Sequence, residues 1–207
     1  MGEYPSNEEF TKIFQNEYYE KRHSDTEKAR RARYALVLDI IGIAVVIVCA
    51  IVLSKFYSLN IVNEQSMDNT IIPRDCIMIA KTEYSFSNVE YGDIIAYTTT
   101  IADGKGGTKN LVSRVIGRPG DTIQIKNGVV LRNGRRLIEN YIKEGRTDGE
   151  IPSVTIPDGS YFVMGDNRQD SIDSRDARIS FVTDGQIIGK VIYRPLPISR
   201  AGTLYGN

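Results

Sequence analysis

Three short segments of the chain contain side chains that could do chemistry. The first is Gln65–Ile71, which contains Ser66, and the other two are residues 111–121 and 164–175, which are rich in Arg and Asp. A serine hydroxyl becomes a good nucleophile when a nearby base takes its proton, and a lysine whose pKa is lowered by burial can be that base. Ser66 is therefore the candidate nucleophile, and Met67 places an apolar side chain directly beside it.

A single apolar stretch precedes these segments. Ala35–Leu53 carries one charge, Asp39, and at about 1.5 Å per helical residue its length approaches the ~30 Å hydrocarbon thickness of a bilayer. A cleaved signal peptide fits poorly, because residues 1–33 are hydrophilic and no small-residue cleavage site follows the stretch. We interpret residues 34–55 as a transmembrane anchor and not as a buried core helix.

The charges beside the apolar stretch predict its orientation. Four basic residues crowd its N-terminal side: Lys28, Arg30, Arg31 and Arg33. Lys55 is the one basic residue just after it, so the positive-inside rule predicts a cytoplasmic segment at 1–33 and an extracytoplasmic domain at 56–207. The expected location is the cell (plasma) membrane, in a single-pass topology with the lipid bilayer as a partner. We interpret Asp39 as reaching back to the headgroup region, in preference to a functional intramembrane charge.

From Asn60 onward the sequence favours β structure. Short β-branched runs predict strands at residues 76–80, 93–97, 154–156, 161–164 and 187–193, with a flexible connection at 102–110. Two Asn-Gly pairs, Asn127-Gly128 and Asn133-Gly134, predict tight hairpin turns. No sustained helical periodicity follows the anchor. We expect one mostly β domain over residues 56–207, with a small β subdomain at about 124–160.

The composition excludes several classes of partner. Lys and Arg number 26, as do Asp and Glu, and this balance gives no reason to expect a nucleic acid. Cys49 lies in the apolar stretch and Cys76 in a predicted strand, so we expect no disulfide. Without a Cys/His cluster we expect neither a metal nor another cofactor. The sequence does not indicate an oligomeric state.

Four motifs in this order resemble those of type I signal peptidases, the bacterial membrane-anchored serine proteases that remove signal peptides. The serine motif is matched at four positions and departs at Asn69, where the family usually has Pro; the matches are Ser66, Met67, Thr70 and Ile71. Three later segments resemble the motifs that follow: Tyr91–Tyr97, Arg114–Asp121 and Gly165–Arg175. The resemblance implies a signal-peptidase-like β-sheet catalytic domain with a small β subdomain, preceded by one transmembrane helix.

One position departs from the family's chemistry. The general base of the family is a lysine directly before the Arg of the third motif, and this chain has Ser113 there. A serine hydroxyl titrates far above neutrality and cannot replace the amine, and the loss of a general base costs ~10²–10⁴ in rate. Three other residues are poor substitutes. His23 precedes the anchor, Lys81 follows a different strand, and Lys109 lies about 13 Å from residue 113 if the strand is extended.

The resemblance also implies supporting roles for other residues of the motifs. Ion pairs and hydrogen bonds are expected to hold the loop of the site, with Arg114 pairing with Asp173; the remaining members are Asp166, Arg168 and Arg175. Ser171 occupies the position that hydrogen-bonds the lysine in the family. An oxyanion hole would use the backbone N–H of Ser66, and Glu64 is an unusual neighbour for the negative charge that develops there.

Three interpretations of function stay open. The first is a signal peptidase I-type serine endopeptidase that uses Ser66 to remove signal peptides from exported preproteins, cleaving after small residues. The second is a catalytically impaired homologue that binds extended peptides, for example as an assembly factor for exported surface proteins. The third is an engineered Lys→Ser change at residue 113 that traps an inactive enzyme. Self-cleaving repressors share a Ser/Lys β fold, but the anchor and the lack of a DNA-binding helical segment argue against them.

Overall fold

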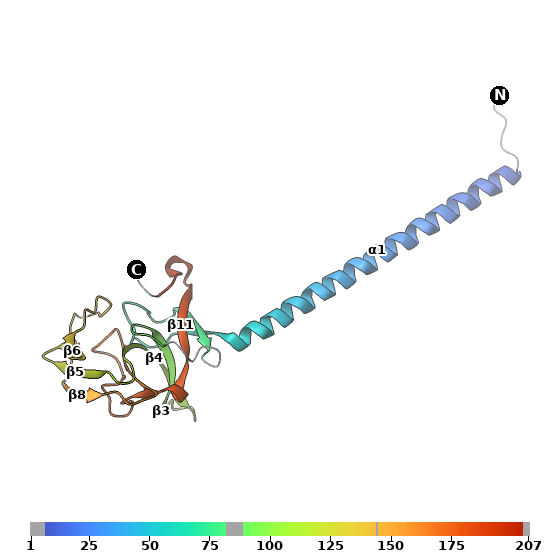
Figure 1. Cartoon of the computed structure of the whole chain (residues 1–207). Coiled ribbons are helices and arrows are strands. Elements are labelled where there is room, and N and C mark those ends of the chain that lie inside the picture. Colours follow the sequence, from blue (N-terminus) through green and yellow to red (C-terminus); the bar gives the residue numbers. More distant parts are fainter. Residues whose placement is uncertain (1–6, 82–88, 144, 205–207) are drawn as a thin grey trace. The chain divides into compact units, whose positions relative to one another are not determined.

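The computed structural model describes residues 7–81, 89–143 and 145–204. The chain divides into two compact units, Met1–Leu53 and Ser54–Asn207 (Figure 1). The described part of the first unit is helical, and all the strands that the structure describes lie in the second.

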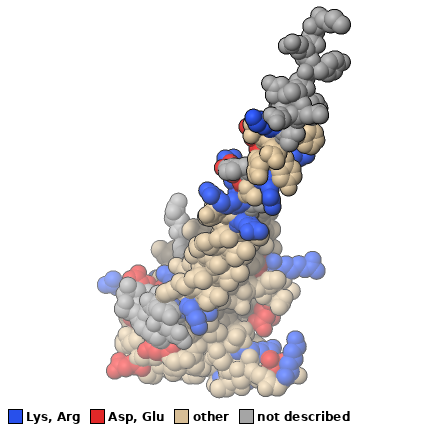
Figure 2. Space-filling model, turned by 90° about the vertical axis from the view of Figure 1, so that its right-hand side faces the viewer, with Lys and Arg blue, Asp and Glu red and all other residues tan. Residues whose placement is uncertain are grey.

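The helix α1 spans Asn7–Phe56. It therefore includes most of the polar N-terminal segment. Between Phe14 and Phe56 it is the one helix in the described part of the chain that is long and apolar enough to cross a membrane. Figure 2 shows Lys and Arg side chains gathered toward the N-terminal part of this helix, followed by an uncharged stretch. Aliphatic side chains of that stretch, from Leu36 to Leu53, are exposed.

The second unit contains a seven-stranded antiparallel sheet in the order β1-β2-β11-β3-β4-β9-β10 (Figure 1). Its strands are β1 Tyr57–Ile61, β2 Cys76–Lys81, β3 Ile94–Ala102, β4 Thr108–Gly117, β9 Ser160–Met164, β10 Val182–Thr183 and β11 Ile187–Leu196. Beyond Phe56 the described residues contain only two short 3₁₀ helices, Asp184–Gln186 and Ile198–Arg200. The expectation of a mostly β domain after one apolar helix is confirmed.

A second, four-stranded sheet is inserted between β4 and β9, in the order β7-β6-β5-β8. Its strands are β5 Thr122–Lys126, β6 Val129–Arg132, β7 Arg135–Arg136 and β8 Ile151–Thr155. Both Asn-Gly hairpins are confirmed, because Lys126 pairs with Val129 and Arg132 pairs with Arg135. Asn127 and Asn133 have φ values of 53° and 52°, as a two-residue turn with left-handed backbone requires.

The connection between β3 and β4 is shorter than the sequence predicted. β3 continues to Ala102 and β4 begins at Thr108, so the loop is confined to residues 103–107. The Asp103 carboxylate accepts hydrogen bonds from the backbone N–H groups of Lys105 and Gly107, at 2.7 and 2.9 Å. A side chain that satisfies its own turn in this way closes a tight hairpin, and the expectation of a flexible segment over 102–110 was wrong.

Candidate active site

Ser66 lies in the loop between β1 and β2 and is half-buried. The residues around it hold the loop against the core of the large sheet: Met67 and Ile71 are fully buried and pack with Ile77, Ile79 and Ile94. The Ile71 N–H donates to the Met67 carbonyl at 2.8 Å, which makes this stretch a helical turn. Two apolar anchors on either side of such a turn leave the Ser66 side chain at the edge of the core.

The loop of Ser66 is joined directly to the last motif. The Asn167 N–H donates to the Ser66 carbonyl at 3.0 Å, and the Asn167 side-chain amide donates to the Gln65 carbonyl at 3.1 Å. A Cβ on Gly165 would come within 2.4 Å of the Ser66 carbonyl oxygen. Only glycine permits this close approach of two backbones. The structure therefore brings together two motifs that are about a hundred residues apart in the sequence.

Ser113 is fully buried in β4. Its Oγ lies 3.2 Å from the hydroxyl of Tyr97 on the neighbouring strand β3, and either oxygen can donate. Burial raises the pKa of Tyr97, the Ser113 hydrogen bond offsets part of this rise, and the charges of Asp173 and Glu64 add to it. The phenol therefore stays neutral at physiological pH, and neither hydroxyl of this pair can accept a proton from Ser66.

The structure describes the surroundings of two of the three alternative bases named from the sequence, Lys81 and Lys109. The Lys81 ammonium donates to the Ser54 carbonyl at 2.7 Å, at the end of β2. Lys109 is the second residue of β4, next to the turn that joins β3 to β4, and its carbonyl accepts a hydrogen bond from the Thr99 hydroxyl. His23 belongs to α1, and its side chain lies outside the described residues. Within the described ranges, Ser66 and Ser113 receive no hydrogen bond from a lysine or histidine.

Arg114 and Asp166 form a buried, bidentate ion pair. Nε and Nη2 of Arg114 donate to the two carboxylate oxygens of Asp166 at 2.8 and 2.6 Å, and both side chains are at most 7% exposed. The hydroxyl of Thr70 donates to the same carboxylate at 2.5 Å, and the ring of Tyr141 stacks on the guanidinium with a 4.2 Å separation. Asp166 thus links β4 to the loop that contains Ser66.

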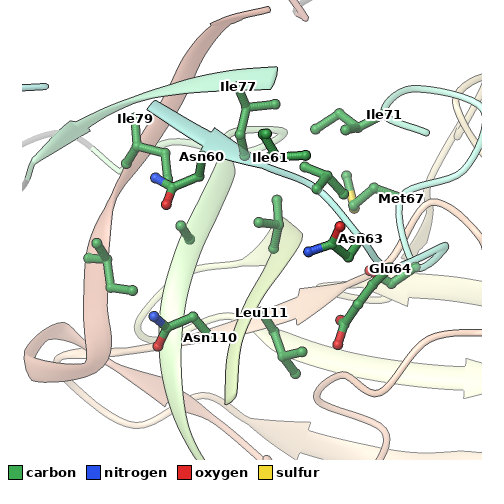
Figure 3. Close-up of a pocket in the computed structure, with 15 residues that line it drawn as sticks. Asn60, Ile61, Asn63, Glu64, Met67, Ile71, Ile77, Ile79, Asn110 and Leu111 are labelled. Carbon is green, nitrogen blue, oxygen red and sulfur yellow. The ribbon is translucent and has the colours of Figure 1, made fainter. Parts of the chain in front are cut away.

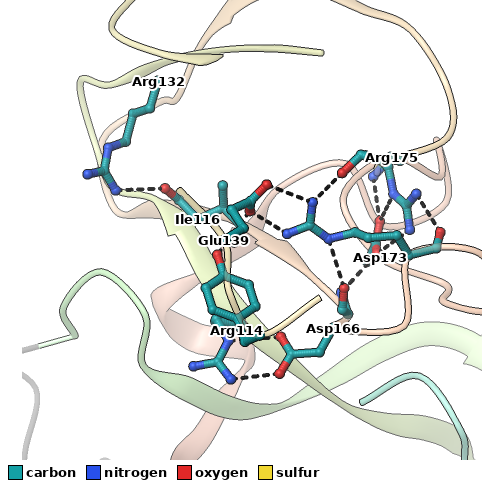
Figure 4. Close-up of polar contacts among 11 residues, drawn as sticks. Arg114, Ile116, Arg132, Glu139, Asp166, Asp173 and Arg175 are labelled. Carbon is teal, nitrogen blue, oxygen red and sulfur yellow. Dashed lines mark hydrogen bonds and ion pairs between the residues drawn. The ribbon is translucent and has the colours of Figure 1, made fainter. Parts of the chain in front are cut away.

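The expected pairing of Arg114 with Asp173 was wrong. Arg114 lies opposite Met164 in the β4–β9 register, which brings its guanidinium to Asp166 just beyond the end of β9. Asp173 instead binds Arg175, whose Nε and Nη2 donate to its two oxygens at 2.9 and 2.8 Å (Figure 4). It also accepts the Gly165 N–H at 3.0 Å, so it fastens the backbone beside Ser66.

Arg168 is fully buried and bound on three sides. It donates to the Gly165 carbonyl at 3.0 Å, to the Thr147 hydroxyl and to both oxygens of Glu139 (Figure 4). Glu139 was missed from the sequence. It belongs to the irregular stretch between β7 and β8, and no local pattern distinguishes it from other acidic residues there. Only the approach of the small-sheet insertion to the last motif reveals this pair.

Ser171 differs from these residues. Its Oγ is buried and is the one such side-chain oxygen or nitrogen without a hydrogen-bond partner among the residues that the structure describes. It lies against Gly165, since a Cβ added there would come within 2.3 Å of the Ser171 Oγ. Arg168, Ser171 and Asp173 therefore all lie against Gly165, and among these described residues Ser171 alone has an unused polar group.

A pocket of about 290 Å³ opens beside Ser66 (Figure 3). Its walls include residues 60–64 at the end of β1 and just beyond it, Met67 and Ile71 of the serine loop, and residues 110–112 of β4. Most of the lining is aliphatic, and Glu64 is the one charged residue that the structure describes there. A pocket of this size and character suits a small or aliphatic side chain. In the described part of the chain, no three His, Cys, Asp or Glu side chains are grouped to hold a metal ion.

Comparison with known proteins identifies the family. A family model described as "Signal peptidase, peptidase S26" matches residues 33–195. The chain is 32% identical over 183 residues to a signal peptidase I from Bacillus amyloliquefaciens, covering 82% of this chain and 95% of the relative. It is 36% identical over 143 residues to a signal peptidase I from Leptolyngbya laminosa, covering 68% and 69%. A crystal structure of a signal peptidase I from Enterococcus faecalis V583 matches at 28% identity with a TM-score of 0.42, covering 52% of this chain and 99% of that one. The chain belongs to the signal peptidase family of serine endopeptidases, peptidase family S26.

Proposed function

We propose that this chain binds the signal peptides of exported preproteins in extended form beside Ser66, and that its own turnover is slow because residue 113 supplies no base. Two observations together carry this proposal. An apolar pocket lies at Ser66, and the hydroxyl of the buried Ser113 has the neutral Tyr97 as its only hydrogen-bond partner in the described chain. The site can hold and orient a peptide, but it lacks an amine beside the nucleophile.

The large sheet offers an edge to which such a peptide can add. In the described structure, β9 pairs with β4 only from Arg114 to Gly117. The preceding part of β4, from Thr108 to Ser113, pairs with β3 on one side and has no strand on the other. An extended peptide can therefore form main-chain hydrogen bonds with this free edge while one of its side chains enters the pocket.

Ser66 retains the setting of a nucleophile. Its loop is held by buried Met67 and Ile71, and its carbonyl is bound by the Asn167 N–H. We propose that the Ser66 hydroxyl attacks the peptide carbonyl and that the Ser66 N–H contributes to the oxyanion hole. Without a base to take the hydroxyl proton, we expect the rate to be lower by a factor of ~10²–10⁴. Arg114, Asp166, Arg168, Asp173 and Arg175 support the site and do not react.

We further propose that residues 34–55 anchor the chain in the cell membrane, with residues 1–33 in the cytoplasm and residues 56–207 outside. The basic cluster before the apolar part of α1 supports this orientation through the positive-inside rule. A membrane anchor suits the substrate, because the apolar part of a signal peptide is itself inserted in the bilayer. Confinement of both to one membrane raises their effective concentration.

A second candidate is a fully active signal peptidase whose base comes from outside the described contacts. The complete Arg114–Asp166 pair and the retained Ser66 favour it, because a pure binding protein has no need of a nucleophile. The same site without turnover would suit an assembly factor for exported surface proteins.

Cleavage of a preprotein by the full-length chain in detergent separates these possibilities. We expect slow or undetectable cleavage by this chain and cleavage ~10²–10⁴-fold faster by Ser113→Lys, because the lysine restores a general base. The matched control is the double variant Ser113→Lys/Ser66→Ala, which should not cleave. Fast cleavage by the unmodified chain that is abolished in Ser66→Ala would contradict the impaired-base proposal and establish the second candidate. Failure of every variant to cleave or to bind the preprotein would reject the peptide-binding function.

A further inference from the structure

Among the described residues that line the Ser66 pocket, Glu64 is the only charged one. Its neighbours there are aliphatic or carry neutral carboxamides, as in Asn60, Asn63 and Asn110. Figure 3 shows the Glu64 side chain directed across the pocket toward Leu111 of β4. The carboxylate therefore lies between the two walls that we propose hold an extended peptide.

The other carboxylates around the site are already neutralised. Asp166 is bound by Arg114, Asp173 by Arg175 and Asp68 by Lys143. Glu64 is exposed, and it has neither a hydrogen bond to its carboxylate nor an ion pair within the described residues. Its charge is thus available to a ligand that enters the pocket.

The influence of Glu64 reaches the wall formed by β3 and β4. Burial is the main cause of the raised pKa of Tyr97, and the charges of Asp173 and Glu64 raise it further. The Tyr97 hydroxyl contacts Ser113. A lone carboxylate is a poor metal site, since hard cations take six or more oxygen ligands, but it is a good partner for an ammonium or guanidinium group.

We propose that Glu64 makes the pocket selective for peptides that carry a Lys or Arg beside the small or aliphatic residue that enters it. The inference rests on the proposed peptide-binding function and adds a specificity-determining residue to it. Lys and Arg can lay their aliphatic stems on an apolar wall and keep the charged end in water, and the wall around Leu111 with Glu64 at its rim offers both features.

The same pairing has a consequence for reaction at Ser66. A bare carboxylate in this pocket opposes the negative charge that develops on the attacked carbonyl oxygen. A cationic peptide residue bound to Glu64 cancels that effect. Peptides with Lys or Arg at this place should therefore both bind better and, in Ser113→Lys, react better than peptides with Glu.

The test uses the full-length chain in detergent with Ser66→Ala, so that no peptide is cleaved. Three labelled synthetic peptides have the same signal-peptide-like sequence, with Lys, Gln or Glu on both sides of the small residue. At low salt we expect the Lys peptide to bind about fivefold more tightly than the Glu peptide, as for an exposed ion pair. The preference should shrink toward unity near about 1 M salt and should disappear in Glu64→Gln.

The matched control is Glu90→Gln, which removes an exposed carboxylate that does not line the pocket and should leave the preference intact. If the Gln peptide binds but the ratio of Lys to Glu affinities is unity, or is unchanged by Glu64→Gln, the role of Glu64 is rejected while the peptide-binding function stands. If even the Gln peptide does not bind to any variant, the proposed function itself is rejected, and the inference falls with it.

Discussion

The two sides of the Ser66 loop differ in how completely their polar groups are satisfied. On one side, Asp166 accepts hydrogen bonds from Arg114 and Thr70, and Arg114 is further covered by the ring of Tyr141. On the other side, Ser113 meets only the neutral Tyr97 hydroxyl, and the buried Ser171 Oγ has no partner among the described groups. The polar groups of the Arg114–Asp166 side are therefore fully hydrogen-bonded, although those of the Ser113–Ser171 side are not.

This difference separates two requirements that act on the same loop. A buried ion pair must be complete for the chain to fold, because a single buried charge is very costly. A general base is needed only for turnover, and its replacement by a small neutral hydroxyl leaves no charge unpaired. A serine at position 113 is therefore compatible with an ordered Ser66 loop.

Breaking the Arg114–Asp166 ion pair should have the largest effect on the stability of the fold. Arg114→Met leaves Asp166 as a buried carboxylate without its guanidinium, and we expect the free energy of unfolding to fall by about 3–5 kcal/mol. Thermal or chemical unfolding of the full-length chain in detergent, followed by circular dichroism, measures the loss. The control is Lys143→Met, which removes the exposed ion pair to Asp68 and should cost at most about 1 kcal/mol. Equal losses in the two variants would show that the buried pair has no special role.

Removing the unpartnered hydroxyl of Ser171, in contrast, should not lower the stability of the fold. Ser171→Ala removes a buried hydroxyl that forms no hydrogen bond to the described chain, so we expect unchanged or slightly higher stability, by up to about 1 kcal/mol. In the Ser113→Lys background the same change should lower preprotein cleavage about tenfold, because the new ammonium loses the hydroxyl that would orient it. Stability and cleavage rates of the four combinations form a double-mutant cycle. A strongly destabilising Ser171→Ala in the original background would mean that the hydroxyl already has a structural partner.

The smallest effect concerns the exposed end of the serine loop. The Lys143 hydrogen bond holds the pKa of Asp68 below its ordinary value of 3.8. A group with a lowered pKa in the folded state stabilises the fold above its unfolded pKa and loses this contribution as the pH falls through the folded value. The stability difference between this chain and Asp68→Asn, roughly 0–1 kcal/mol, should therefore be present at about pH 6 and vanish by about pH 2. Melting temperatures at several pH values measure it, and a difference that persists at the lowest pH would exclude this ion pair as its source.

Local sequence patterns were sufficient for several features of the molecule. The apolar stretch of α1, the β class of residues 56–207 and both Asn-Gly hairpins follow from hydropathy, β-branching and turn chemistry, which act between residues close together in the chain. The roles of Ser66 as nucleophile and of Ser113 at the position of the base stay predictions, which rest on short motifs that resemble those of the family in type and order. The loop between β3 and β4 was misjudged since its closure depends on the carboxylate of Asp103 and not on its glycines alone.

Only the tertiary structure decided which groups meet. The register of β4 against β9 places Arg114 beside Asp166, and Asp173 pairs with Arg175. The insertion of the small sheet brings Glu139 to Arg168, a residue 29 positions away. The same packing leaves the Ser171 Oγ without a partner in the described chain and directs Glu64 into the pocket of Ser66. These outcomes depend on contacts between segments that are distant in the sequence. Sequence periodicity reflects only nearby residues, so it does not predict which charged groups the fold brings within hydrogen-bond distance.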